Sequence, residues 1–98
     1  MKIPDKIQIA GRIFDIVYNN ELNNEYGSSA EINPDKCKII IQGNCKGNER
    51  NQQSIYISFL HEIIHAISKI SGNRKLYEDE QFTEQFTELL YQVIKQIT

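Results

Sequence analysis

The spacing of apolar residues changes near the middle of the chain, and this change constrains the fold more than any other feature. Apolar and polar residues alternate over much of the first 42 residues, as they do in half-buried strands. From about residue 50 onward, apolar residues recur every three or four positions, as they do in amphipathic helices. The sequence therefore predicts an α+β domain in which strands come first and helices second.

Two hairpins are predicted in the strand-rich segment, residues 1–42. Residues 6–18 alternate on both sides of Ala10-Gly11, where glycine can supply a tight turn. Residues 28–32 form a short strand candidate, and the β-branched run at 37–41 is long enough for a buried strand. We therefore expect a small antiparallel or mixed sheet of about four strands.

Two helices are predicted after the strands, over residues 48–70 and 77–97. Asn48 is a suitable N-cap for the first helix, and Gly72 follows its last turn. A short connector makes the helices antiparallel, and we expect both on one face of the sheet. The apolar residues of the second helix form one stripe: Phe82, Phe86, Leu89, Leu90, Val93 and Ile97.

Length and composition narrow the class of protein. A chain of 98 residues with 40% hydrophobic and 24% charged residues is expected to form one globular domain, residues 1–98. The net charge of −2 and the lack of a basic face argue against nucleic-acid binding. No apolar stretch is long enough to span a bilayer, and the N-terminus does not resemble a signal peptide, so a cytoplasmic location is expected.

The two cysteines, Cys37 and Cys45, are expected to be reduced thiols. A secreted disulfide scaffold of this size would carry more cysteines, and C-x-x-C is absent. A disulfide between them, or a Cys2His2 metal site completed by two histidines, are the alternatives.

The first predicted helix carries the sequence His61-Glu62-Ile63-Ile64-His65, an H-E-x-x-H pattern. These are the only histidines in the chain, and two placed at random would fall four apart in roughly 2% of cases. At 100° per residue, both histidines lie at the border of the apolar face of the helix. Residues at i and i+4 can converge on one zinc ion, and Glu62 is close enough to act as a general base on a metal-activated water. Two histidines satisfied by backbone or water are the structural alternative.

A catalytic zinc site needs a third protein ligand, and the chain has no third histidine. A carboxylate from the second helix is therefore expected. Glu84, about two turns into that helix and flanked by Thr83 and Thr87, is the first candidate, and Glu80 is its competitor on the same face. The donor that stabilises the oxyanion stays open among Tyr26, Tyr77, Tyr91 and Arg74.

The strand-rich half, the segment F-L-H-E-I-I-H-A-I at 59–67 and the Glu-rich helix at 78–95 together resemble a known family. The chain looks like the small zincin-like metallopeptidases of phages and mobile elements, relatives of the ImmA/IrrE-type group and of the gluzincins. The resemblance implies a minimal zincin-like fold, with zinc held by His61, His65 and a glutamate of the second helix. It also implies an edge strand beside the active-site helix, where a peptide adds as an extra strand; residues 28–32 are the candidate.

The leading hypothesis is therefore a zinc metallopeptidase that acts on a peptide or protein, such as a regulatory protein. A zincin-fold binding module with a structural zinc is the second. A helical interaction protein without metal is the third.

Overall fold

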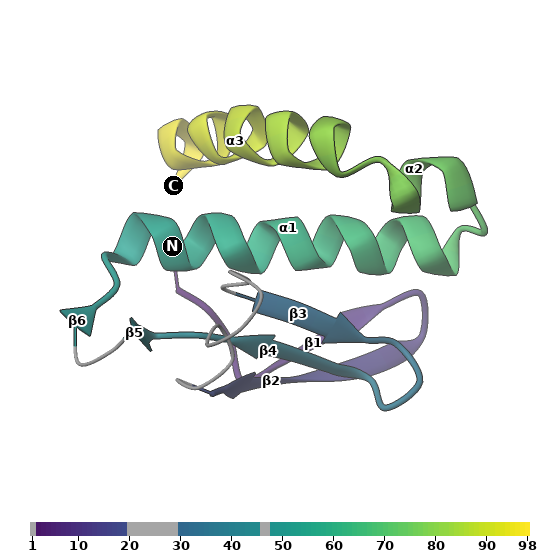
Figure 1. The fold of residues 1–98 in the computed structure, drawn as a ribbon, viewed down its shortest axis with the longest axis horizontal. Coiled ribbons are helices and arrows are strands. Elements are labelled where there is room, and N and C mark those ends of the chain that lie inside the picture. Colours follow the sequence, from purple (N-terminus) through teal and green to yellow (C-terminus); the bar gives the residue numbers. More distant parts are fainter. Residues whose placement is uncertain (1, 20–29, 46–47) are drawn as a thin grey trace.

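The first half of the chain forms a four-stranded mixed sheet in the computed structural model, which describes residues 2–19, 30–45 and 48–98 (Figure 1). The strand order is β1-β2-β4-β3. The β1–β2 and β3–β4 pairs are antiparallel hairpins, whereas β2 and β4 run parallel. A sheet followed by helices confirms the predicted α+β fold. The strands are β1 (Lys6–Ile9), β2 (Arg12–Tyr18), β3 (Ala30–Asn33) and β4 (Lys38–Ile41).

The two hairpin turns depend on positive φ angles. Ala10 and Gly11 join β1 to β2 with φ of 50° and 82°, as a two-residue turn of the right twist requires. The predicted turn at Ala10-Gly11 is therefore confirmed. In the second hairpin, the turn extends to Cys37, whose φ is 52°, so β4 begins one residue later than predicted. Cys37 is a free thiol. The Cys45 side chain lies outside what the structure describes.

The start of the first helix differs from the prediction. The segment predicted as a polar loop forms a short hairpin, β5 (Asn44–Cys45) with β6 (Asn48–Glu49). The chain is still extended at Asn48, so Asn48 cannot cap a helix. Asn51 is the N-cap of α1 (Gln52–Ile70), and its side chain accepts a 2.8 Å hydrogen bond from Ser54 N.

The sheet, α1 and α3 form three successive layers (Figure 1). One face of α1 packs on the sheet through Phe59 and Ala66, which share a buried cluster with Phe14 and Ile39. α3 lies along the other side of α1, antiparallel to it, and packs on α1 and α2 (Figure 1). Within the described residues, none of the helices has the length and apolar character that a membrane crossing requires.

The predicted second helix is divided in two, which corrects its expected start at Tyr77. α2 (Arg74–Glu78) is followed by Asp79, whose φ of −88° and ψ of 84° are not helical. The Asp79 side chain then accepts a 2.9 Å hydrogen bond from Phe82 N and caps α3 (Glu80–Ile97).

α3 packs on α1 through small side chains rather than through its apolar stripe. Thr83 and Thr87 are fully buried, and Tyr91 stacks near Tyr56 with ring centroids 6.5 Å apart. Each threonine hydroxyl donates to the carbonyl four residues earlier, so neither of these two buried hydroxyls is left unsatisfied. These short side chains allow the backbones of α1 and α3 to approach closely.

Candidate metal centre

α1 carries both the sheet-facing core and the site residues. Ile63 packs against the buried cluster on the sheet and Ile64 is buried, so the two isoleucines between the histidines hold the helix in place. His61, Glu62 and His65 lie at one side of α1 and line a cavity of about 550 Å³. One stretch of sequence therefore serves both packing and the site.

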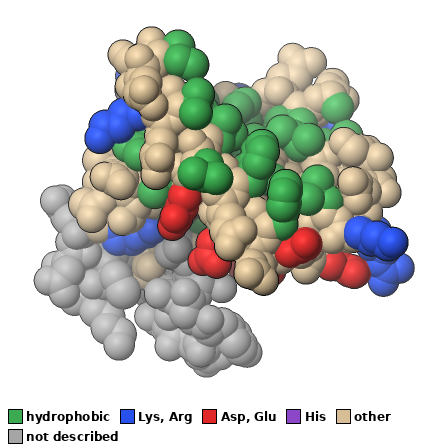
Figure 2. All heavy atoms as spheres, turned by 90° about the horizontal axis from the view of Figure 1, so that it is seen from above, with side chains coloured by type: hydrophobic (Ala, Val, Ile, Leu, Met, Phe, Trp, Pro, Cys, Tyr) green, Lys and Arg blue, Asp and Glu red, His purple; other side chains and the backbone are tan. Residues whose placement is uncertain are grey.

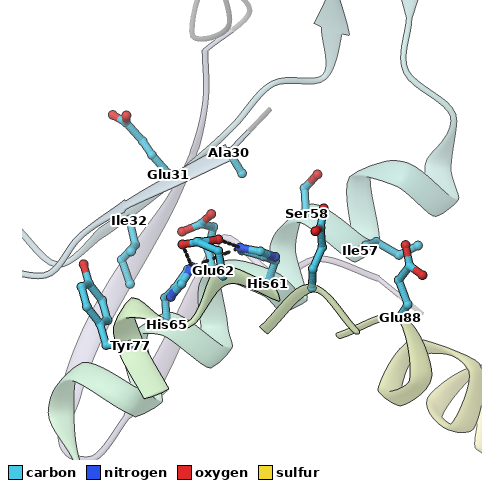
Figure 3. A pocket seen from close by; sticks show the side chains of 12 residues that line it. Ala30, Glu31, Ile32, Ile57, Ser58, His61, Glu62, His65, Tyr77 and Glu88 are labelled. Carbon is cyan, nitrogen blue, oxygen red and sulfur yellow. Dashed lines mark hydrogen bonds and ion pairs between the residues drawn. The ribbon is translucent and has the colours of Figure 1, made fainter. Parts of the chain in front are cut away.

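Three ligand atoms converge in this cavity (Figure 3). His61 Nε2 lies 3.1 Å from His65 Nε2 and 3.1 Å from Glu80 Oε2. His65 Nε2 lies 2.8 Å from Glu80 Oε1. Among the described histidine, cysteine and acidic residues, these three form the group that could hold one metal ion.

The distances suit a tetrahedral zinc ion. Ligand atoms about 2.0–2.1 Å from zinc are about 3.3 Å apart in a tetrahedron, close to the separations of His61, His65 and Glu80. Two histidines and one carboxylate leave the fourth position open, as in catalytic zinc sites. The donor set and its geometry therefore fit zinc.

Glu80, the competitor in the sequence, is the glutamate that meets the histidines; the first candidate, Glu84, is outside this group. The break at Asp79 is the physical reason, because it sets where α3 begins. At 100° per residue, Glu80 lies within the arc of Thr83, Thr87 and Tyr91 that faces α1, and Glu84 lies beyond its edge. Glu84 lines the same cavity but is one turn farther along α3, about 6 Å.

Burial favours the neutral form of His65 that a metal requires. Its side chain is buried, and this burial lowers its pKa, although the nearby Glu80 opposes the effect and His61 adds to it. Nδ1 of His65 has no hydrogen-bond partner among the described residues. Nε2 is therefore the nitrogen that faces His61 and Glu80. A neutral imidazole presents its lone pair to a cation.

Glu62 is a buried carboxyl group beside the two imidazoles (Figure 3). It is 7% exposed, and burial raises its pKa to about 7, with smaller contributions from the charges of Glu80 and Glu31. A carboxyl group with a pKa near neutrality can take up and release a proton at physiological pH.

The cavity also contacts the edge of the sheet. Ala30, Glu31 and Ile32 of β3 line it, and among the described strands β3 lies at one edge of the sheet and contacts α1. The predicted edge strand is therefore confirmed for residues 30–32, while residues 28 and 29 lie outside the described residues. Glu31 was not singled out from the sequence, although its place on an expected edge strand was a usable signal.

The four candidates for the oxyanion donor are now separated by position. Tyr77 of α2 lines the cavity, and its ring packs edge-on against His65 with centroids 5.3 Å apart. Tyr91 is buried against Tyr56, and Arg74 pairs with Glu78 at 2.9 Å. Tyr26 lies outside the described residues. Among the candidates that the structure describes, Tyr77 is therefore the one that lines the same cavity as the histidines.

The buried carboxyl group of Glu62 is expected to destabilise the metal-free protein at high pH. The folded state holds the Glu62 proton up to about pH 7, whereas the unfolded chain releases it near 4.5, so stability falls as pH rises through this window. The pKa difference corresponds to about 3 kcal/mol above pH 7. In chelator, Glu62→Gln should therefore raise the free energy of unfolding at pH 8 by about that amount and leave it unchanged near pH 4.5.

Urea unfolding at both pH values measures this difference. Glu84→Gln, which removes an exposed carboxylate from the same cavity, is the matched control and should change little. Equal stabilities of Glu62→Gln and the original chain at pH 8 would contradict the burial argument.

Comparison with known proteins gives no match to a family model, a curated protein or a solved structure.

Proposed function

We propose that the protein is a zinc-dependent peptidase. The observation that supports this most is the convergence of His61, His65 and Glu80 within 3.1 Å of one another, with the buried Glu62 beside them. An H-E-x-x-H segment on a helix is the usual zincin arrangement of two ligands and a general base. The free Cys37 thiol fits the reducing compartment, the cytoplasm, that we propose for it.

Each of the site's side chains would have a separate role in the reaction. Glu62 takes a proton from the attacking water and then gives it to the amine that leaves. The Tyr77 hydroxyl is the candidate donor to the oxygen that becomes negative. Zinc, when bound by the two histidines and Glu80, would polarise the scissile carbonyl and lower the pKa of water toward 7.

The edge of β3 offers a place for an extended peptide. In the described residues, β3 pairs with β4 on one side, and its residues 30–32 border the cavity on the other. A peptide that adds to β3 as a further strand would bring a backbone carbonyl alongside His61 and His65. We therefore propose an extended segment of a protein as the substrate.

The charge of the cavity favours a basic substrate. Glu84 and Glu88 follow Glu80 along one face of α3, and no Lys or Arg is among the described residues that line the cavity. A bound Zn²⁺ would offset Glu62 and Glu80 but leave Glu84, Glu88 and Glu31 of β3 uncompensated. We therefore expect faster cleavage of peptides that carry Lys or Arg near the cleaved bond.

The double variant Glu84→Gln/Glu88→Gln should lower kcat/KM about tenfold for a Lys-containing peptide, since each surface charge contributes up to about 1 kcal/mol. A peptide with Gln in place of Lys should be cleaved as before. Glu78→Gln, on an exposed carboxylate outside this cavity, is the control. An equal loss on both peptides would count against charge selection.

Zinc content and peptide cleavage together test the proposed function. The purified chain should hold about one zinc ion, cleave an unfolded protein or a peptide library, lose this activity in chelator and regain it with zinc. Less than about 0.2 zinc per chain would exclude a zinc site of useful affinity. Stoichiometric zinc without any cleavage would instead favour the binding module with a structural metal.

A further inference from the structure

The apolar stripe of α3 lies on the surface, on the part of the helix that does not pack on α1. Figure 2 shows hydrophobic side chains gathered in a band over this region, with acidic side chains along one edge of it. The stripe's exposed members are Phe82 (43%), Phe86 (45%), Leu89 (62%), Val93 (52%) and Ile97 (78%). The two phenylalanine rings stack with centroids 5.6 Å apart, so the band begins as one continuous aromatic surface.

The size of this surface matches what a dimer buries. Five side chains of roughly 150–200 Å² each, about half exposed, present roughly 500 Å² of apolar area, at the upper limit for a monomer. A stable dimer buries about 800 Å² on each partner, and about 65% of a homodimer interface is apolar, which is again about 500 Å². The stripe therefore supplies the apolar part of one such interface.

We propose that two copies of this chain associate through α3, with the two helices antiparallel. The four exposed positions from Phe82 to Val93 are spaced four, three and four apart, which is the seam spacing of packed helix pairs. Leu89 lies near the middle of the stripe, so a twofold axis beside it makes the surface self-complementary. Phe86 then faces Val93 of the second copy, and Phe82 faces Ile97, which places large side chains opposite smaller ones.

The charges of α3 favour a second copy over a charged partner. Glutamines border one side of the stripe, at Gln85, Gln92 and Gln96. On the helical wheel Glu84, Glu88 and Lys95 point away from the centre of the stripe, so no charged side chain lies within the seam itself. An uncharged apolar seam bordered on one side by glutamines suits a self-pairing surface.

This interface does not depend on the proposed peptidase activity. Glu80, Glu84 and Glu88 line the cavity from the other side of α3, so the paired stripes leave both cavities accessible. Failure of the dimer would leave the metal site unaffected, and failure of the metal site would leave the stripe.

Sedimentation velocity of the full chain at about 50 µM tests the inference. The original chain should sediment as a dimer, and Leu89→Glu should weaken association at least about 100-fold because it places two carboxylates at the axis. Ile13→Glu is the matched control: Ile13 is 59% exposed on β2, away from α3, and this variant should stay dimeric. An unchanged circular dichroism spectrum and zinc content would show that Leu89→Glu is folded.

The orientation is tested by disulfide crosslinking in a chain with Cys37 and Cys45 replaced by Ser. Phe86→Cys and Val93→Cys should crosslink to one another when mixed and little when separate. A monomeric original chain, a dimer that survives Leu89→Glu, or a dimer lost in Ile13→Glu overturns the α3 interface. Efficient crosslinking of Phe86→Cys to itself overturns the antiparallel arrangement.

Discussion

Replacing Glu80 with Ala is expected to lower zinc affinity by more than about 100-fold, which exceeds the usual cost of losing an outer-shell partner. The reason is that its two carboxylate oxygens lie 2.8 Å and 3.1 Å from the histidine nitrogens, so it would complete the three-ligand set of the proposed zinc site. The two imidazoles alone would leave zinc with more solvent ligands and a much weaker site. Competition with a chromophoric chelator at pH 7.5 measures the affinity.

Glu84→Ala is the control for this experiment. Glu84 lines the same cavity, carries the same charge and lies one turn farther along the same helix. Its replacement should leave the zinc affinity within about threefold of the original, because only a weak, solvent-screened attraction is lost. Loss of zinc in Glu84→Ala with retention in Glu80→Ala would assign the third ligand to Glu84 instead.

Glu62→Gln is expected to lower kcat about 10²- to 10⁴-fold with little change in zinc affinity. Gln has nearly the shape of Glu and fills the same buried position, but it cannot accept a proton. Since Glu62 is not one of the three converging ligands, zinc should remain bound. The measurement is peptide cleavage at saturating zinc, with zinc content determined on the same samples.

Glu31→Gln is the matched control for the general base. Glu31 borders the same cavity from β3, but it belongs to the edge strand rather than to the segment of α1 that holds both histidines. Its replacement should keep kcat within a few fold. If Glu62→Gln retained full activity, another group would have to serve as the base, and the assignment of Glu62 would fail.

The first half of the fold was largely predictable because its signals are local. Alternation of apolar residues around Ala10-Gly11 predicted the first hairpin, and a β-branched run at 37–41 predicted β4. The parallel pairing of β2 with β4 was not predictable in this way. These two strands are not consecutive in the sequence, and no short-range pattern records which strands become neighbours.

The same difference between local and long-range signals applies to the site. His61, Glu62 and His65 could be placed from the sequence, since positions i and i+4 on one helix meet wherever that helix lies. The carboxylate that meets the histidines comes from a second helix, and the sequence left Glu84 and Glu80 as alternatives because it did not show that Asp79 breaks the expected continuous helix. A short polar residue such as Asp79 can cap a helix or lie inside one, and its presence in the sequence does not tell which.

The sequence by itself determined the helical spacing of the two histidines, the strand-then-helix order and the apolar stripe of α3. Each depends on residues a few positions apart, whose geometry the backbone period sets. The tertiary structure decided that Glu80 meets the histidines and that α3 packs through Thr83 and Thr87, leaving its stripe exposed. These outcomes depend on how two helices cross, because small side chains that let backbones approach can prevail over a larger apolar face.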